Sequence, residues 1–256
     1  MSGKEEKLHK LHIGTSGWSY KHWAGIFYPE GLKPAKWLEY YLLHFQCVEL
    51  NSSFYHLPRE STVAGWLHRV PEDFIFCPKL SRYITHRQKL QDSGGSLERF
   101  FDVFSALKPR LGPVLVQFPP GMGYDKNKVD GFFTMLHDNY PEYRFAVEVR
   151  HPSWFNDTFY NLLEKNNAAF VIADSGKRYP YQEVVTARYV YLRFHGREKL
   201  YASDYSIDTL KAYSEKIIQW LTDNREVWVF FNNDFNGYAL RNASTLSDLI
   251  MGPEIK

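Results

Sequence analysis

The sequence predicts an α/β fold, a single-domain (β/α)8 barrel of the TIM type, from two observations. First, short apolar runs alternate with amphipathic segments along the 256 residues, and strands that alternate with helices form parallel sheets. Second, Glu148 and Arg150 stand two apart in the apolar run Phe145–Arg150. Residues two apart point to the same face of a strand, so this buried strand needs a polar interior. A closed barrel with charge at one end supplies it.

The expected strands are short runs rich in branched or aromatic residues, bounded by polar loops. They cover Leu11–Ser16, Cys47–Asn51, Phe74–Lys79, Val114–Phe118, Phe145–Arg150, Ala169–Asp174, Tyr189–His195 and Val227–Asn232. The expected helices show apolar residues at helical spacing. They cover Pro34–Phe45, Glu60–Val70, Ser96–Leu107, Lys126–Asp138, Asp157–Lys165, Gln182–Thr186, Ile207–Thr222 and Ala243–Met251. The short segment Gln182–Thr186 makes the sixth crossover the weakest, and an open doubly wound sheet is the alternative fold.

Composition limits the class of protein. A net charge of +2 is too small to indicate nucleic-acid binding by itself. The two cysteines, Cys47 and Cys77, have no disulfide or zinc spacing and read as small buried residues, which favours a reducing cytoplasm. Residues 1–10 are polar and lysine-rich and are expected to form a loose tail before a barrel domain at 11–256. No run approaches the roughly 20 apolar residues of a membrane span, so no membrane partner is expected; the oligomeric state stays open.

The inward parity of the strands carries polar side chains near the strands' C-terminal ends, where barrel enzymes place their chemistry. This predicted ring consists of Ser16, Glu49, Asn51, Lys79, Gln117, Glu148, Arg150, Asp174, Arg193, His195 and Asn232. The alternative interpretation is a purely structural ion network of glutamates with lysine and arginines.

The loops that follow the strands add aromatic and basic residues to this ring. They contribute Trp18, Tyr20, Trp23, Phe54, Tyr55, Arg82, His86 and His151. Aromatic faces next to cations suit a ring-shaped ligand with anionic oxygens, such as a nucleotide, a phosphosugar or single-stranded nucleic acid. Ordinary loop packing is the alternative for each aromatic residue.

The pattern leads to a hydrolase or lyase hypothesis. Lys79, Arg150 and Arg193 would hold a phosphate-bearing ligand, and Glu49 and Glu148 would orient these cations. Glu148 would serve as general base and His195 as general acid. A Schiff base on Lys79 is a further option, weighed against a salt bridge with a glutamate. No Gly-x-Ser-x-Gly elbow, dinucleotide fingerprint or P-loop is present.

Other classes of function remain open beside this one. No cofactor is expected, although Glu49, Glu148, Asp174 and His195 could converge on a divalent metal. The rival function is a nucleic-acid-binding or repair-type protein that takes up a single strand or an extruded base. A third is an interaction scaffold whose site is degenerate.

Several motifs together resemble the YecE-like family, the domain of unknown function numbered seventy-two, from about Ile13 to Leu249. The motifs are Gly14–Tyr20 with Trp23 and Gly25–Pro29, Glu49–Tyr55, Phe76–Lys79, Thr85-His86, Leu111–Pro113, Gln117–Pro119, Glu148–His151 with Trp154, Arg193–Gly196 and Phe231–Asp234. The resemblance implies a TIM-type barrel and no specific reaction. Similarity of the fold to sugar-isomerase and abasic-site-endonuclease barrels is a poor guide to function.

Overall fold

The computed structural model describes residues 9–91 and 93–252. Its eight strands follow the sheet order β3-β2-β1-β8-β7-β6-β5-β4, and the paired strands run parallel. The first and last strands are neighbours, because β1 (Leu11–Thr15) pairs along its length with β8 (Glu226–Phe231). A sequential order in which the first strand pairs with the last belongs to the (β/α)8 class and not to a doubly wound sheet. The predicted fold class is confirmed.

The chain contains two compact units, described here one at a time. Unit 1 comprises residues 1–48, 172–181 and 188–256, and unit 2 comprises residues 49–171 and 182–187. Strand β2 (Cys47–Leu50) starts in unit 1 and ends in unit 2, whereas β6 (Ala169–Asp174) starts in unit 2 and ends in unit 1.

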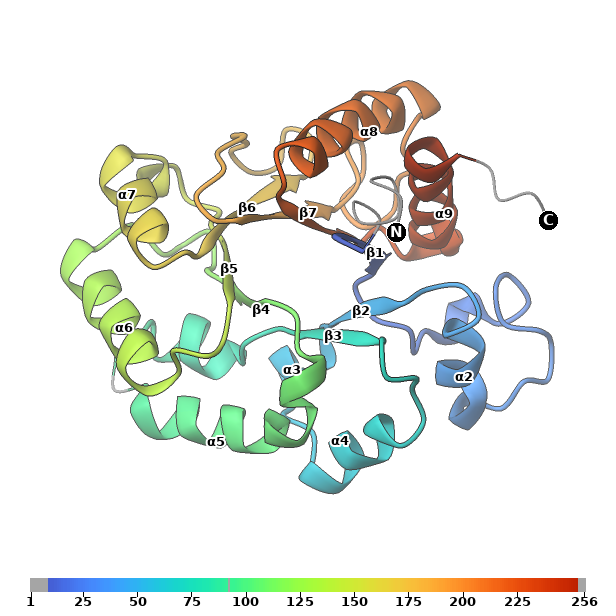
Figure 1. Ribbon diagram of the computed structural model, residues 1–256, viewed down its shortest axis with the longest axis horizontal. Helices are drawn as coiled ribbons and strands as arrows, with labels where there is room; N and C mark the ends of the chain where they lie inside the picture. The colour runs from blue at the N-terminus through green and yellow to red at the C-terminus, as the bar shows by residue number, and fades with distance from the viewer. Residues whose placement is uncertain (1–8, 92, 253–256) are drawn as a thin grey trace. The chain divides into compact units, whose positions relative to one another are not determined.

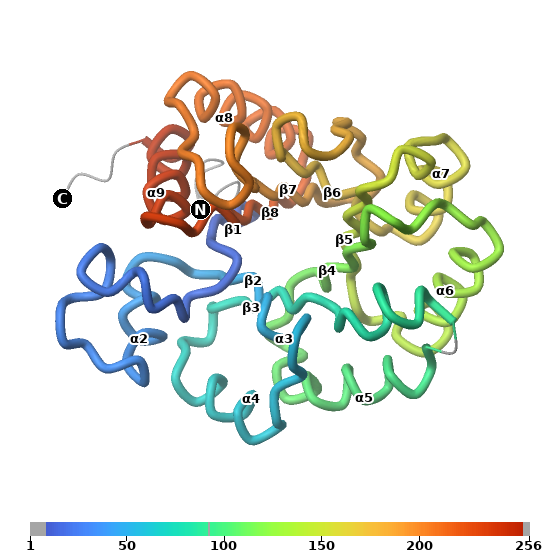
Figure 2. Tube along the Cα trace, turned by 180° about the vertical axis from the view of Figure 1, so that it is seen from behind, coloured from blue at the N-terminus to red at the C-terminus, as the bar shows by residue number. Residues whose placement is uncertain are grey.

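Unit 1 holds both ends of the described chain. Besides β1 and β8, its elements are η1 (Lys21–Trp23), η2 (Pro34–Lys36), α2 (Trp37–Tyr41), β7 (Tyr189–Phe194), α8 (Ile207–Thr222), η6 (Phe235–Gly237) and α9 (Tyr238–Met251). Helices α8 and α9 lie side by side (Figures 1 and 2). Phe194 of β7 contacts both β8 and α8. Its ring stacks on that of Phe231 in β8, with centroids 4.6 Å apart, and meets the ring of Tyr213 in α8 edge-on, also at 4.6 Å. This contact confirms that Phe194 faces the helices, as the strand parity predicts.

Unit 2 holds the three strands that lie between β2 and β6 in the sequence, with the helices next to them in the chain. Its elements are α3 (Ser52–Tyr55), α4 (Glu60–Leu67), β3 (Ile75–Pro78), the π-helix η3 (Tyr83–Arg87), α5 (Gly94–Phe104), η4 (Ser105–Arg110), β4 (Val114–Gln117), α6 (Lys126–Asn139), β5 (Phe145–Glu148), η5 (Pro152–Trp154) and α7 (Asp157–Lys165). Side-chain caps set two helix starts: Asp125 accepts a hydrogen bond from the backbone N–H of Lys128, and Asn156 accepts one from that of Phe159.

The helix predicted at Gln182–Thr186 is absent, and this prediction was wrong. These residues have no regular structure. Instead, the Thr186 hydroxyl accepts a hydrogen bond from the Phe170 N–H at 2.8 Å and donates one to the Ala168 carbonyl at 2.7 Å. A β-branched residue has a low helix propensity, and these two hydrogen bonds to the backbone of the β6 segment compete with helix formation at Thr186.

Smaller differences concern the ends of elements. The segment expected as one helix at Pro34–Phe45 forms η2 and then α2, which ends at Tyr41. Several strands end one or two residues earlier than expected, so Lys79, Arg150 and His195 lie just beyond β3, β5 and β7. A sequence pattern places the first and last residues of a helix or strand only to within one or two positions.

The remaining expectations concern the N-terminal tail, the two cysteines and membrane-spanning helices. Residues 1–8 of the expected tail lie outside the described residues, but Lys10 already accepts a hydrogen bond from Val227 N–H at 2.7 Å. Cys47 and Cys77 are both buried, and neither forms a disulfide bond. Among residues 9–91 and 93–252, no helix combines the length and apolarity needed to cross a membrane.

Candidate functional site

A buried ion pair of unit 2 joins the last residue of β5 to the residue two positions later. Glu148 is the last residue of β5, and its side chain is only 1% exposed. Arg150 directs Nε and Nη2 to the same carboxylate oxygen, Oε1, each at 2.7 Å. A buried carboxylate is tolerable when a guanidinium donates to it. The contact agrees with the two-residue spacing, which predicts that both side chains point to the same side.

Lys79 follows β3 and is held by the end of β4. It is 7% exposed, and its Nζ donates to Oε1 of Gln117 at 3.0 Å. Gln117 in turn donates from Nε2 to the Phe118 carbonyl at 2.7 Å, which fixes the orientation of its amide. The structure therefore brings a desolvated cation to a neutral amide at the C-terminal ends of two neighbouring strands.

A buried aromatic ring of α3 contacts this cation. The ammonium of Lys79 lies 3.9 Å from the centre of the Phe54 ring, and the His86 ring meets Phe54 edge-on at 4.9 Å. The hydroxyl of Ser53 lies 2.8 Å from the Leu50 carbonyl oxygen and 2.7 Å from that of Lys79, so it ties α3 to both strand ends. Phe54 thus has a fixed position between the ammonium and the imidazole.

His86 lies in the π-helix η3 and has an altered pKa. Burial, and then the positive charges of Lys79, Arg150 and Arg82, lower the pKa of His86 from 6.5 to about 4, with Glu148 acting in the opposite direction. Its Nδ1 lies 2.8 Å from the Thr85 hydroxyl. The imidazole is neutral at pH 7, and the charges that act on it come from two segments, one after β3 and one at the end of β5.

These residues form one group in unit 2, which we call the His86 cluster. It consists of Phe54, Lys79, Arg82, His86, Gln117, Glu148 and Arg150. Arg82 was expected among the residues of the loops but not as a ligand-binding residue. It lies in the loop after β3, three residues past Lys79.

Four further predicted residues of unit 2 lie near the strand ends or in the loops after them. Glu49 is fully buried in β2, and Asn51 follows that strand half-buried. Tyr55 is 59% exposed, and the Phe54 ring meets it edge-on. His151 accepts a hydrogen bond from the Ser153 N–H and caps η5, which gives it a local structural role.

Unit 1 brings three of the predicted residues together around one imidazole. Nη1 of Arg193 lies 3.5 Å from Nε2 of His195, and Asn232 lies 3.1 Å from Nδ1. Arg193 and His195 are both fully buried. The guanidinium of Arg193 and the amide nitrogen of Asn232 are both donors, and a neutral imidazole can accept from only one of them. The role of His195 as general acid stays a prediction.

Asp174 has its own set of partners in unit 1. Its Oδ2 accepts from Nε of Arg197 at 2.8 Å and from the hydroxyl of Tyr213 at 2.9 Å, while Oδ1 accepts from the Gly176 N–H at 3.2 Å. Burial and then the negative charge of Asp174 raise the pKa of Tyr213, so the phenol stays a donor. Asp174 therefore anchors the loop that follows β6 and the long helix α8.

The predicted residues of the first loop are packed by contacts within unit 1. Ser16 is 1% exposed, and its carbonyl accepts from the Tyr20 hydroxyl at 2.5 Å. Trp18 is also buried, and its backbone carbonyl accepts a hydrogen bond from the Tyr28 hydroxyl. Trp23 is fully buried and donates to a backbone carbonyl 2.9 Å away, that of Asp234.

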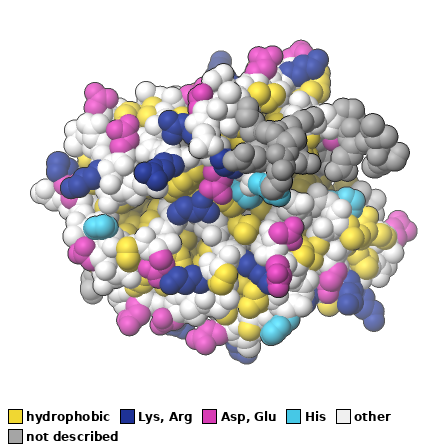
Figure 3. All heavy atoms as spheres, viewed as in Figure 1, with side chains coloured by type: hydrophobic (Ala, Val, Ile, Leu, Met, Phe, Trp, Pro, Cys, Tyr) yellow, Lys and Arg dark blue, Asp and Glu magenta, His cyan; other side chains and the backbone are white. Residues whose placement is uncertain are grey.

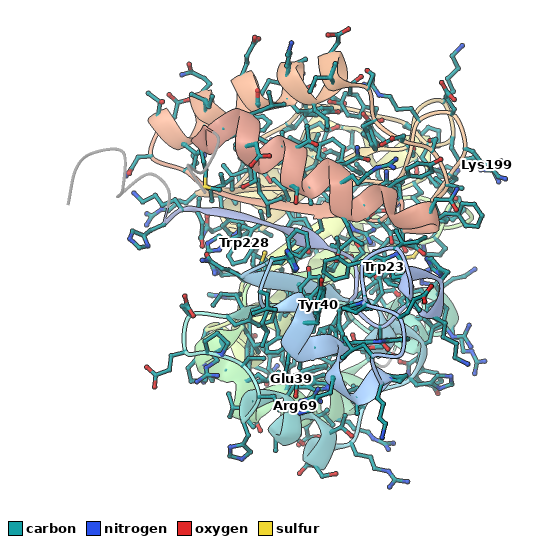
Figure 4. All side chains as sticks on the ribbon, turned by 90° about the vertical axis from the view of Figure 1, so that its right-hand side faces the viewer. Trp23, Glu39, Tyr40, Arg69, Lys199 and Trp228 are labelled. Carbon is teal, nitrogen blue, oxygen red and sulfur yellow. The ribbon has the colours of Figure 1, made fainter. Side chains whose placement is uncertain are left out.

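A packed aromatic layer surrounds Trp23. Phe27 meets Trp23 edge-on at 5.9 Å and Tyr40 of α2 at 5.2 Å; Figure 4 labels Trp23 and Tyr40 in this part of unit 1. Packing, the alternative weighed from the sequence, accounts for the contacts of Trp23. For the metal alternative, the described residues contain no group of three or more His, Cys, Asp or Glu side chains placed to hold an ion.

The chain resembles proteins and structures of one family. UPF0759 protein YecE of Escherichia coli is 26% identical over 234 residues, with 82% of each chain covered. UPF0759 protein YunF of Bacillus subtilis is 26% identical over 270 residues, with 94% of each covered.

Two crystal structures agree with the fold. A DUF72 family protein from Thermotoga maritima matches with a TM-score of 0.85 at 33% identity, over 94% of this chain and 98% of that one. One from Enterococcus faecalis matches with a TM-score of 0.80 at 22% identity, over 96% and 99%, a likeness that shows the fold alone. The model of the family described as "Protein of unknown function DUF72" matches residues 12–254, and the chain belongs to the DUF72 family.

Proposed function

We propose that this protein binds an anionic, phosphate-bearing small ligand at the His86 cluster of unit 2. The observation that carries the proposal is the convergence of three cations, Lys79, Arg82 and Arg150, on one neutral histidine. Two of the three are largely desolvated: Lys79 is 7% exposed, and the Arg150 side chain, which pairs with Glu148, is 10% exposed. A desolvated cation attracts an anion more strongly than a cation in water does.

The donors of the cluster suit a phosphate in number and kind. Arg150 and Arg82 have planar guanidinium groups, and Lys79 offers an ammonium that donates to the neutral amide of Gln117. The neutral imidazole of His86 adds no positive charge of its own. The proposed chemistry is that of a hydrolase or lyase, with the carboxylate of Glu148 as general base.

Removal of the lysine charge tests the proposal. Ribose 5-phosphate and inorganic phosphate serve as ligands, and binding is measured by calorimetry and by the shift in melting temperature. Lys79→Met should weaken binding about tenfold or more, because a charge-assisted hydrogen bond contributes about 1.5–3 kcal/mol. Arg99→Gln is the control, since Arg99 is an exposed cation of α5 in the same unit. Equal binding to both variants would place the ligand elsewhere and remove the proposal.

A second candidate function, the binding of single-stranded nucleic acid, is favoured by one contact. Arg82 lies over the ring of Tyr55, which is 59% exposed, and such pairs also bind nucleobases. Against it, the net charge is only +2, and on the face seen in Figure 3 lysines and arginines alternate with acidic residues. A steep fall of oligonucleotide affinity with salt would support this candidate, and binding of ribose 5-phosphate with no affinity for oligonucleotides would exclude it.

We propose the cytoplasm as the compartment. The two cysteines, Cys47 and Cys77, are buried and form no disulfide bond, which supports a reducing environment. Fractionation of the native host, with the protein followed by antibody, is the direct test.

A further inference from the structure

We propose that the ligand of the His86 cluster carries an aromatic ring joined to its phosphate through a pentose, a nucleoside 5′-phosphate unit, and that the ring stacks on Tyr55. This inference rests on the proposed function and narrows it to one ligand class. The support comes from an exposed aromatic and cationic surface that continues directly from the phosphate-binding residues.

Tyr55 is the last residue of α3 and is unusually open for its size. It is 59% exposed, and Tyr83 at the start of η3 is 49% exposed. Single exposed aromatic residues are ordinary on protein surfaces. These two differ because Arg82, the residue before Tyr83, holds its guanidinium 5.6 Å from the centre of the Tyr55 ring. The result is an exposed tyrosine ring with a guanidinium over it at the edge of the cluster.

One buried ring connects this surface to the phosphate-binding cation. Phe54 lies 3.9 Å from the ammonium of Lys79 on one side and meets the Tyr55 ring edge-on at 5.0 Å on another. The cation and the exposed tyrosine are therefore separated by a single aromatic side chain. A pentose has about the size needed for a ligand to reach from one to the other.

Arg82 belongs both to the phosphate-binding residues and to the exposed surface at Tyr55. Its positive charge helps to lower the pKa of His86, which places it among the charges of the phosphate site. Its planar group also lies over Tyr55. A guanidinium stacked on a ring keeps its N–H edge available for a phosphate or for the acceptor atoms of a base.

A phosphosugar without a base leaves this surface unused. It can engage Lys79 and Arg150 but has no π-face for Tyr55. A base stacked on an aromatic side chain should raise affinity about 5- to 150-fold. The prediction is therefore a difference between two ligands that share the same phosphate and pentose.

The experiment compares dissociation constants for ribose 5-phosphate, adenosine 5′-monophosphate and a single-stranded pentanucleotide. The variants are Tyr55→Ala, Tyr55→Phe, which keeps the ring, and Tyr181→Ala, which removes a tyrosine of unit 1 that is 42% exposed. The nucleotide should bind the parent about 5- to 150-fold more tightly than ribose 5-phosphate. Tyr55→Ala should abolish this margin and leave ribose 5-phosphate binding within about twofold, whereas Tyr55→Phe and Tyr181→Ala should preserve it.

The other outcomes separate the two proposals. Equal affinities of the nucleotide and ribose 5-phosphate for the parent, or a margin that survives Tyr55→Ala, would overturn the stacking inference and leave phosphate binding intact. Absence of binding by all three ligands would remove both. A margin that depends on Tyr55 and is larger for the pentanucleotide than for the mononucleotide supports the stacking and identifies the source of the nucleotide as a strand.

Discussion

Arg150 folds back onto Glu148, two residues earlier in the chain, and places both Nε and Nη2 at 2.7 Å from the same carboxylate oxygen. The glutamate side chain is 1% exposed and that of the arginine 10%. Since neither charge is well hydrated, each depends on the other for compensation. The pair fixes the end of β5 and sets the charge of the His86 cluster.

Glu148→Gln should lower the free energy of unfolding by about 1–3 kcal/mol, because glutamine keeps an acceptor oxygen but leaves the arginine without its counter-charge. Urea unfolding followed by circular dichroism measures this loss. Glu164→Gln, at an exposed position of α7, should stay within about 0.5 kcal/mol of the parent. Equal stabilities of the two variants would show that the ion pair contributes nothing to folding.

His86 should make the protein less stable in mild acid. Its pKa in the folded state is about 4, below the ordinary 6.5 expected of the unfolded chain. Between these values the unfolded chain binds a proton that folded His86 does not. The contribution of His86 to stability is therefore complete above pH 6.5 and is lost as the pH falls toward 4.

Unfolding by urea at pH 7 and at pH 5 measures this contribution. His86→Gln should lose less stability between the two values than the parent does. His68→Gln, which alters an exposed histidine, should follow the parent. The ring signals of His86 in NMR spectra should shift near pH 4 rather than near pH 6.5. A parent-like loss in His86→Gln would mean that another group causes the acid sensitivity.

Local patterns in the sequence predict some features of the site and the fold, and long-range contacts decide others. Spacing alone predicted the pairing of Glu148 with Arg150, because strand parity is a local property. The fold class followed from the alternation of strands and helices for the same reason. The absent helix at Gln182–Thr186 depends on bonds of Thr186 to Phe170 and Ala168, and no local pattern contains such contacts.

Long-range contacts also decide which aromatic residues are exposed. Trp23 and Tyr55 both follow strands in polar loops, and the sequence treats them alike. In the structure Trp23 is fully buried and donates to the carbonyl of a residue 211 positions away, whereas Tyr55 is 59% exposed. The low pKa of His86 likewise arises from burial and from charges on two segments, one after β3 and one at the end of β5. Burial and electrostatic potential are properties of the folded chain, so a sequence pattern can only nominate such residues.

Tyr213→Phe should cost more stability than a similar change at Tyr160. The Tyr213 hydroxyl donates to the buried carboxylate of Asp174 at 2.9 Å, whereas that of Tyr160 donates to the amide of Gln182 at 2.8 Å. Hydrogen bonds to charged groups contribute about 1.5–3 kcal/mol, and neutral ones about 0.5–1.5 kcal/mol. Thermal and urea unfolding of both variants give the comparison, and a larger loss for Tyr160→Phe would contradict the anchoring role of Asp174.

Two glycines should respond in opposite directions to replacement by alanine. At Gly14 in β1 an added Cβ would clash with the carbonyl oxygen of Cys47 and lie 3.2 Å from its Sγ. Because the clash is with backbone of the neighbouring strand, relief requires β1 and β2 to separate. Gly14→Ala should therefore destabilise the protein by about 1–3 kcal/mol.

At Gly65, inside α4, an added Cβ meets nothing within 4 Å. Alanine costs less backbone entropy than glycine in a helix, so Gly65→Ala should stabilise the protein by about 0.5–1 kcal/mol. Urea midpoints of the two variants on either side of the parent value are the expected result. If Gly14→Ala matched the parent, β1 and β2 would not be packed as closely as the Gly14–Cys47 contact requires, and the register of Thr15 opposite Val48 would be in question.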